Sequence, residues 1–454
     1  MRGVLIKNVM LTVSVLAIVA YLLVPIRTKW STAAPDVTVL QFWHPWTGEY
    51  ADALNEVIAE FNRRHPKIRA VPLFMPTGAG ESMKFFSSVA GGVPPDVIVV
   101  DGTQVASWAD LGVLQPLGER LSAAGVGEDD FWEPSWRQCR YNGKTWAISA
   151  AADPNFILVW NKHLFRQAGL DPERPPRTIK ELEKYALKLT RYDAAGRVEQ
   201  LGFMPTYVPH GSIAVLTWGW AFGGEFYNDD TQEFTCDDPN AVAGLEWIVH
   251  MDEQYGGMSK LGSFQSTFGL SASDPFNVGK LAMNISYISL TQQIAKFAPN
   301  LEYGMAPLPR KEGVEPGPEW IGGWTMALPY GERGNEDEAF ELILWMCADP
   351  YGSRYMARRM KLLPAYKKSP FFEKDVPGDP ILEMYMEILA RAKHIRPITP
   401  ANAQYMTELL RALGRARTKD MSPREALEEA RRRVEKEWAK IQKRTKAKHT
   451  LKEG

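Results

Sequence analysis

The sequence predicts an α/β protein with at least two hydrophobic cores. It has 454 residues, and a single core normally stops growing at about 250 to 300 residues. Its composition, 45% apolar and 24% charged, is that of an ordinary globular protein, which excludes a largely disordered or collagen-like chain. Strand and helix patterns alternate over residues 37–100, and such alternation is typical of βαβ units with a mainly parallel sheet.

The predicted elements follow from the spacing of apolar residues. Residues 37–43 form a buried strand, and residues 47–62 form a helix because apolar side chains recur there at helical spacing. A second strand (68–74), a second helix (81–90) and a third strand (96–100) follow. Further on, two capping boxes mark helix starts, one from Thr178 to Glu181 and one from Ser422 to Glu425, which opens a carboxy-terminal helix.

The amino terminus predicts a location outside the cytoplasm. Residues 8–26 carry no charge and follow Arg2 and Lys7, a pattern that lies between a cleaved signal peptide and a membrane-spanning helix. We expect residues 1–34 to be an uncleaved signal anchor with its linker, and the bulk of the chain to lie outside. Cleavage near Ala34, followed by secretion, is the alternative.

Charge and cysteine content exclude several classes of protein. A formal charge of −1 argues against a nucleic-acid binder. Residues 401–454 hold 15 basic and 8 acidic side chains, and their alternating signs suit a solvated helix face better than a membrane-binding one. The three cysteines are isolated, so we expect free thiols, no metal and no cofactor (Cys139, Cys236 and Cys347).

No sequence motif of an enzyme is present. The sequence lacks G-x-S-x-G and H-E-x-x-H, and Gly78-Ala79-Gly80 lacks the rest of a phosphate-binding loop. We therefore expect a protein without catalytic activity. A glycoside hydrolase with two carboxylates across a cleft stays open, since sequence spacing does not report that geometry.

Several segments, taken in order, resemble one family. They include FWHPWTGEYADALNEVIAEFNRRHPKI, VAGGVPPDVIVVD, YNGKTWAIS, GKLAMNISY and IGGWTMALP. Together they resemble the extracellular solute-binding proteins of ABC importers, in the sugar-binding group that includes maltose-binding protein. The resemblance implies the two-lobed periplasmic-binding-protein fold of class II type, with a hinge and interleaved lobes. Lobe 1 would comprise residues 35–150 and 305–363, and lobe 2 residues 151–304 and 364–454.

The strand ends supply the first candidate ligand-binding residues. Ligands of open α/β sheets bind beyond the carboxyl ends of the strands, where the first strand delivers Trp43, His44 and Trp46 and the third delivers Asp101. Aromatic rings beside hydrogen-bonding groups suit sugars, which have both apolar faces and hydroxyls. For Asp101, ligand binding is one possible role and capping the amino terminus of the next helix is the other. His44 suits the edge of a cleft better than a metal site.

Further candidates depend on glycines and on the resemblance. Trp218 and Trp220 lie beside glycines, but one of an alternating pair should face the core. The resemblance places Gly323 with Trp324, and also Tyr287, in the cleft, although the usual Gly-Pro-Trp is missing at residues 286–289. Two residues at the predicted first crossing, Asp153 and Asn155, have hinge and ligand roles in competition.

These features together predict a protein that closes its hinge around a mono- or oligosaccharide. The resemblance implies ABC permease subunits as partners and a position at the outer face of the cytoplasmic membrane, either anchored by residues 8–26 or secreted. One alternative is a protein that binds another solute, such as a glycerol phosphodiester. An anionic ligand of this kind needs a basic residue in the cleft, and Lys361 is the candidate. Another is a ligand-sensing partner of a membrane receptor.

Overall fold

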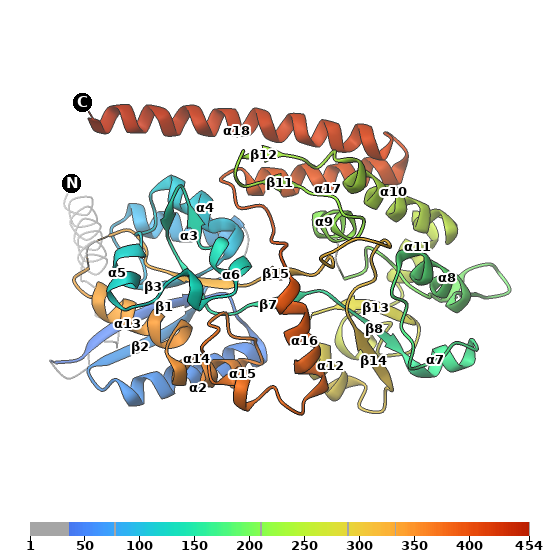
Figure 1. The fold of residues 1–454 in the computed structure, drawn as a ribbon, viewed down its shortest axis with the longest axis horizontal. Coiled ribbons are helices and arrows are strands. Elements are labelled where there is room, and N and C mark those ends of the chain that lie inside the picture. The colour runs from blue at the N-terminus through green and yellow to red at the C-terminus, as the bar shows by residue number, and fades with distance from the viewer. Residues whose placement is uncertain (1–35, 77–78, 209–210, 288–289, 332, 454) are drawn as a thin grey trace, which may run out of the picture.

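The computed structural model describes residues 36–453 except 77–78, 209–210, 288–289 and 332. Within these residues the chain forms two α/β lobes side by side along the long axis of the molecule (Figure 1). The predicted signal anchor, residues 8–26, lies outside the described range. Among the helices that the structure describes, none combines the length and the apolar character needed to cross a membrane.

The first lobe is built on a five-stranded sheet of order β2-β1-β3-β16-β6. The strand β1 (Thr38–His44) runs parallel to β2 (Ile68–Phe74) and β3 (Val97–Asp101), which confirms the three predicted strands. From a distant part of the chain, β16 (Trp324–Ala327) pairs antiparallel with β3 and with β6 (Ile148–Ser149), so the sheet is mixed. Its helices are α2 (Gly48–Arg64), α3 (Ala79–Ala90), α4 (Gly102–Leu111), α5 (Gly118–Ala123), α6 (Glu133–Arg137), α13 (Glu336–Cys347) and α14 (Pro350–Met360), with a hairpin of β4 (Arg140–Tyr141) and β5 (Lys144–Thr145).

The second lobe has a smaller sheet, and that sheet is antiparallel. Its central strand β8 (Ile157–Asn161) pairs with β13 (Met283–Ser286) and β14 (Tyr303–Ala306). The prediction of parallel pairing came from residues 37–100 and does not extend to this lobe, where both neighbours of β8 come from far along the chain and run against it. The surrounding helices are α7 (Lys162–Gln167), α8 (Ile179–Leu189), α9 (Ser212–Ala221), α10 (Pro239–Gln254), α11 (Met258–Gln265), α12 (Leu290–Phe297) and α16 (Pro380–Arg391). Two hairpins are formed by β9 (Arg191–Tyr192) with β10 (Val198–Gln200) and by β11 (Tyr227–Asn228) with β12 (Glu233–Phe234). The short helix α15 (Phe371–Lys374) packs on α14 of the first lobe (Figure 1).

Paired segments connect the lobes. The strand β7 (Asp153–Asn155) pairs antiparallel with β15 (Trp320–Gly322), and Trp320 in turn bridges to His394. We call these three segments the hinge. The predicted boundary between residues 304 and 305 falls inside a strand, because β14 stays in the second sheet as far as Ala306.

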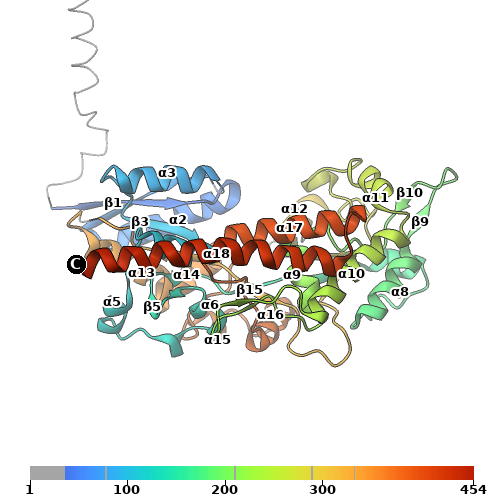
Figure 2. The same cartoon turned by 90° about the horizontal axis from the view of Figure 1, so that it is seen from above.

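Two long helices follow the hinge. The helix α17 (Asn402–Thr418) packs on the second lobe, and α18 (Pro423–Glu453) packs along α17. The predicted capping box is confirmed, since the Glu425 N–H donates to Ser422 Oγ at 3.3 Å and the Ser422 N–H donates to the Glu425 carboxylate at 2.9 Å. The predicted cap at Thr178 is confirmed as well. Both views show α18 extending from the second lobe to lie over the first (Figures 1 and 2).

Candidate functional site

A cleft of about 360 Å³ lies between the lobes, beside the hinge. Its walls combine aromatic rings with a small number of charged and amide side chains, and they come from both lobes and the hinge. The lining residues are Trp46, Tyr50, Asp101, Asp153, Asn155, Ile213, Tyr287, Trp320, Gly322, Gly323, Trp324, Leu362 and Arg396. Seven of the eleven predicted site residues are among them: Trp46, Asp101, Asp153, Asn155, Tyr287, Gly323 and Trp324.

Aromatic rings of the first lobe meet at the ends of its strands. Trp46 lies two residues after the end of β1, and Trp324 is the first residue of β16, so the sheet brings both to one edge. Their rings meet edge to face with centroids 6.2 Å apart. Across the cleft, Tyr287 is 42% exposed and packs against Phe156 with ring centroids 4.6 Å apart. The cleft therefore has apolar surface on both lobes.

Asp101 joins the two lobes through an ion pair. Both of its carboxylate oxygens accept from Arg396 Nη2, at 2.9 and 2.8 Å. One oxygen also accepts from the backbone N–H and the hydroxyl of Thr103, so Asp101 caps α4 as well. Burial opposes ionisation of Asp101, but the Arg396 charge and the hydrogen bonds from Arg396 and Thr103 outweigh it and hold its pKa below the usual value. Both predicted positions of Asp101, in the cleft and at the helix start, are found.

Arg396, the cation among the described residues that line the cleft, was not predicted from the sequence. Arg396 lies between α16 and α17, and its guanidinium stands 5.0 Å from the ring centroid of Trp320, another lining residue that was missed. The basic residue that was predicted, Lys361, ends α14 and lines a neighbouring cavity beside α12. No local pattern predicts that residues 392–401 return to the hinge, so sequence spacing gave no signal for Arg396.

Asp153 and Asn155 belong both to the hinge and to the cleft. They lie in β7, and an Asp153 carboxylate oxygen accepts from the backbone N–H of Leu363 at 2.9 Å. Burial raises the pKa of Asp153 to about 7, against the lowering effect of that hydrogen bond. Asn155 Nδ2 donates to the backbone carbonyl of Asp153 at 3.0 Å. The two predicted roles are therefore compatible for both residues.

Gly323 is required by a close approach of two chain segments. A Cβ atom at this position would lie 2.6 Å from the backbone carbonyl oxygen of Ala151. Any larger residue would push β16 away from the segment that leads into β7. The glycine thus keeps Trp324 in place beside the hinge.

The structure does not place the other four predicted residues in the cleft. Trp43 and His44 still belong to β1, which ends one residue later than predicted, and both are buried. Trp43 lies in the core beneath Lys84, whose Nζ is 4.5 Å from the ring centroid. His44 packs against Trp46 with centroids 6.0 Å apart, and burial lowers its pKa to about 4. In this part of the chain, a side chain reaches the cleft only beyond the end of β1, at Trp46.

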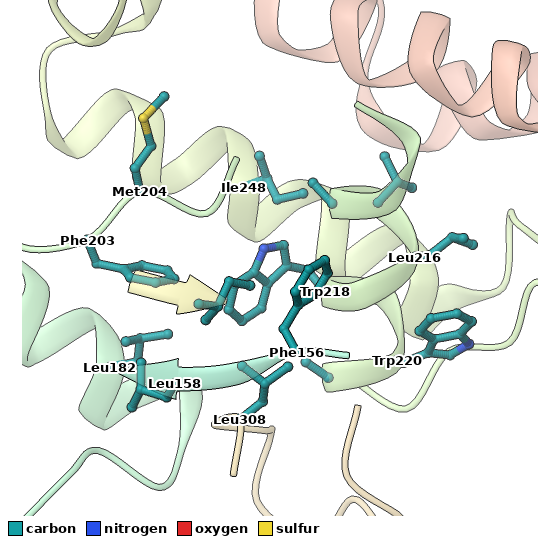
Figure 3. Close-up of a cluster of buried hydrophobic side chains, with 14 of the residues drawn as sticks. Phe156, Leu158, Leu182, Phe203, Met204, Leu216, Trp218, Trp220, Ile248 and Leu308 are labelled. Carbon is teal, nitrogen blue, oxygen red and sulfur yellow. The ribbon is translucent and has the colours of Figure 1, made fainter. Parts of the chain in front are cut away.

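Trp218 and Trp220 lie on a helix instead of an alternating strand. The helix α9 is buried on nearly all sides, so both rings face protein. Trp218 is enclosed beside Phe203 and Ile248 (Figure 3), and its Nε1 donates to the carbonyl of Pro205 at 2.9 Å. Trp220 stacks on His394 with centroids 5.0 Å apart, in a second cavity of about 210 Å³. Both tryptophans therefore stabilise the second lobe and its contact with the hinge.

Two α/β lobes, joined by paired hinge strands around an aromatic and polar cleft, form the architecture of a two-lobed solute-binding protein. Residues 44–351 match the family of bacterial extracellular solute-binding proteins. The chain belongs to this family. The resemblance found in the sequence is thereby confirmed.

Solved structures agree with this assignment. The structure of CpMnBP1 with mannotriose bound is 29% identical and covers 87% of this chain and 100% of that one, with a TM-score of 0.75. The GacH receptor of Streptomyces glaucescens is 20% identical, with 89% and 99% covered and a TM-score of 0.71. MalE from Bdellovibrio bacteriovorus, bound to maltotriose, is 19% identical, with 88% and 99% covered and a TM-score of 0.69. The last two establish similarity of fold alone.

Curated relatives carry a different ligand in their names. The sn-glycerol-3-phosphate-binding periplasmic protein UgpB of Salmonella paratyphi A is 25% identical over 311 residues, which are 65% of this chain and 68% of that protein. UgpB of Pectobacterium atrosepticum is 26% identical over 164 residues, or 35% of this chain. The match spans only 36% of the length of this second relative.

Proposed function

We propose that this protein binds a neutral carbohydrate, a mono- or oligosaccharide, in the cleft and delivers it to the permease of an ABC importer without chemically changing it. One observation carries the proposal: aromatic rings surround a cleft whose single arginine, among the residues described, is already neutralised by Asp101. The resemblance to CpMnBP1 with mannotriose bound supports a sugar as ligand.

The cleft matches the two surfaces of a sugar. The rings of Trp46, Trp324 and Tyr287 offer flat apolar area for the C–H faces of a pyranose. Polar atoms of Asp101, Asn155 and Arg396 line the same space and are available to pair with hydroxyl groups, which is required because an unpaired buried hydroxyl is costly. A volume of about 360 Å³ is at the lower end for ligand pockets, so we propose a small sugar.

The charges of the cleft argue against an anionic ligand. A phosphate would compete with Asp101 for Arg396, whose Nη2 contacts both carboxylate oxygens. Taking the arginine away would leave a buried carboxylate without its counter-charge, which costs more than the pair itself contributes. Asp153, close to the same space, would add a further negative charge once ionised.

A glycerol phosphate compound is the second candidate ligand. Two observations favour it: Arg396 lies in the cleft, and the curated relatives are named for sn-glycerol 3-phosphate. This reading requires Arg396 to exchange Asp101 for phosphate when the ligand enters. Thermal stabilisation by sn-glycerol 3-phosphate therefore separates the two candidates.

Hinge closure provides the mechanism. The first lobe contributes Trp46, Asp101 and Trp324, and the second contributes Tyr287 and Ile213, so a ligand that contacts both walls stabilises the closed arrangement by its additional contacts there. The permease, or a membrane receptor in the sensing alternative, would then recognise the closed form. The signal anchor of residues 8–26 stays a prediction, which mass spectrometry of the mature amino terminus tests.

The experiment is a titration of the described protein with a defined set of ligands. Thermal unfolding and calorimetry are measured with mannobiose, mannotriose, maltose and sn-glycerol 3-phosphate. We expect at least one neutral sugar to raise the melting temperature and the phosphate to leave it unchanged. Stabilisation by the phosphate alone would contradict the sugar assignment. Release of free monosaccharide from any of these sugars would contradict the absence of catalysis.

A further inference from the structure

The long helix α18 makes its last described side-chain contacts on the first lobe, although it packs on the second. Leu427, Val434 and Trp438 are buried in the core of the second lobe. Two turns after Trp438, Arg444 and Thr445 reach Asp110 at the end of α4, in the first lobe. Figures 1 and 2 both show the helix passing from one lobe to the other.

Asp110 is a buried acceptor for these contacts. Its side chain is 1% exposed, and its carboxylate accepts from Arg444 Nη2 at 2.9 Å and from Thr445 Oγ1 at 2.8 Å. The hydroxyl of Tyr141, also in the first lobe, donates to the same carboxylate at 3.3 Å. A buried carboxylate needs a counter-charge, and Arg444, whose side chain is 47% exposed, supplies it here.

Ion pairs connect the two lobes in this structure. Lys296 of α12 pairs with Glu49 of α2, and Arg396 pairs with Asp101 across the cleft. On the other face of the hinge, Arg137 of α6 lies 3.4 Å from Asp229 of the second lobe. The contact of α18 with Asp110 therefore forms in the same arrangement of the lobes as the ion pairs Lys296–Glu49 and Arg396–Asp101.

We propose that Arg444 and Thr445 form a clasp on Asp110 that holds the first lobe against the second and favours the closed cleft. Because α18 is fixed to the second lobe, it moves with that lobe as a rigid rod. Hydrogen bonds of 2.8 to 2.9 Å are lost when the donor and acceptor separate by about 1 Å. The clasp therefore forms only over a narrow range of lobe angles, and its free energy adds to that of ligand binding.

The inference rests on the hinge movement of the proposed function, but its test needs no ligand. Cysteines replace Asp52 in α2 and Gln293 in α12, two exposed positions on opposite lobes, and carry spin labels for distance measurement. The native cysteines are all buried, so labelling is selective. Distances are recorded without ligand for the otherwise unchanged chain and for Arg444→Ala, Asp110→Asn and Lys443→Ala.

We expect Arg444→Ala and Asp110→Asn to shift the distance distribution toward longer values. Lys443→Ala removes the same charge from an exposed neighbouring position and should leave the distribution unchanged. Asp110→Asn leaves no buried charge unpaired, so it separates loss of the clasp from damage to the first lobe. The same distribution in all four proteins would overturn the proposal.

The affinity for a ligand is a second, independent measurement of the effect of the clasp. With mannobiose as the probe, loss of the clasp should weaken binding at least about threefold, since part of the closed population is lost before binding. Failure of every protein to bind mannobiose would count against that sugar as ligand and would leave the distance result in force. Longer distances with unchanged affinity would overturn the coupling between the clasp and the cleft.

Discussion

The two walls of the cleft are built differently. In the first lobe, Trp46, Asp101 and Trp324 lie at the ends of β1, β3 and β16, where a sheet brings side chains to one edge. On the opposite side, Tyr287 directly follows β13, but Arg396 lies in the long connection between α16 and α17. A wall made of strand ends follows from local patterning, whereas a wall made of connections depends on how the whole chain is threaded.

The largest effect is expected at Asp153, between the two walls. Its pKa is about 7 in the folded protein and near 4 in the unfolded chain, so between these values only the unfolded chain has released the proton. Stability therefore falls as pH rises from about 4 to 7, by on the order of 3 kcal/mol from this group. Asp153→Asn should remove this loss.

Urea unfolding at a series of pH values measures the difference between wild type and Asp153→Asn. Asp129→Asn, at an exposed position of the first lobe, is the control. Burial, and to a smaller extent the charge of Asp153, raises the pKa of Tyr385 of α16 far above this range, so Tyr385 does not titrate between pH 4 and 7. A constant difference between wild type and Asp153→Asn from pH 4 to 7 would contradict the buried acid.

The next effect tests the connecting wall. Arg396→Ala leaves Asp101 buried without its cation and should lower the free energy of unfolding by about 2 kcal/mol at neutral pH. Arg391→Ala, which removes an exposed cation five residues earlier, should cost less than about 0.5 kcal/mol. Equal losses of unfolding free energy in the two variants would show that the ion pair between Arg396 and Asp101 does not stabilise the fold.

The strand-end wall is tested through binding. Trp324→Ala removes an aromatic face and should weaken binding of whichever sugar stabilises the protein by about tenfold to thirtyfold. Trp146→Ala removes a partly buried tryptophan of the same lobe outside the cleft, and calorimetry should find its affinity unchanged. If both variants lost affinity equally, the effect would come from the lobe as a whole.

The smallest effect on binding is expected at Trp43. This residue belongs to β1 and its side chain lies in the core of the first lobe, so Trp43→Phe should cost about 1 kcal/mol of stability and leave affinity unchanged. Thermal unfolding and calorimetry on one preparation measure both. If Trp43→Phe lost more affinity than Trp324→Ala, that result would show that Trp43 contacts the ligand.

Sequence reasoning succeeded where local rules apply. The strands and helices of residues 37–100 and the caps at Thr178 and Ser422 follow from spacing and hydrogen-bonding chemistry. Trp43 and His44 failed because β1 continues to His44, and a shift of one or two residues decides whether a side chain faces core or cleft. Trp218 and Trp220 failed because the apolar run 212–221 is a helix, a distinction that a short apolar run does not reveal.

The course of α18 also determines which positions on the chain are suitable for fluorophores that report lobe movement. The strand β1 and the last turns of α18 both lie against the first lobe. The turn of residues 193–196, between β9 and β10, belongs to the second lobe and is exposed at the far end of the molecule (Figure 2). A fluorophore before β1 and another in this turn would report lobe movement as a change in energy transfer. A pair placed before β1 and on the last turns of α18 would report the same movement, because α18 is fixed to the second lobe and leaves the first lobe when the lobes separate.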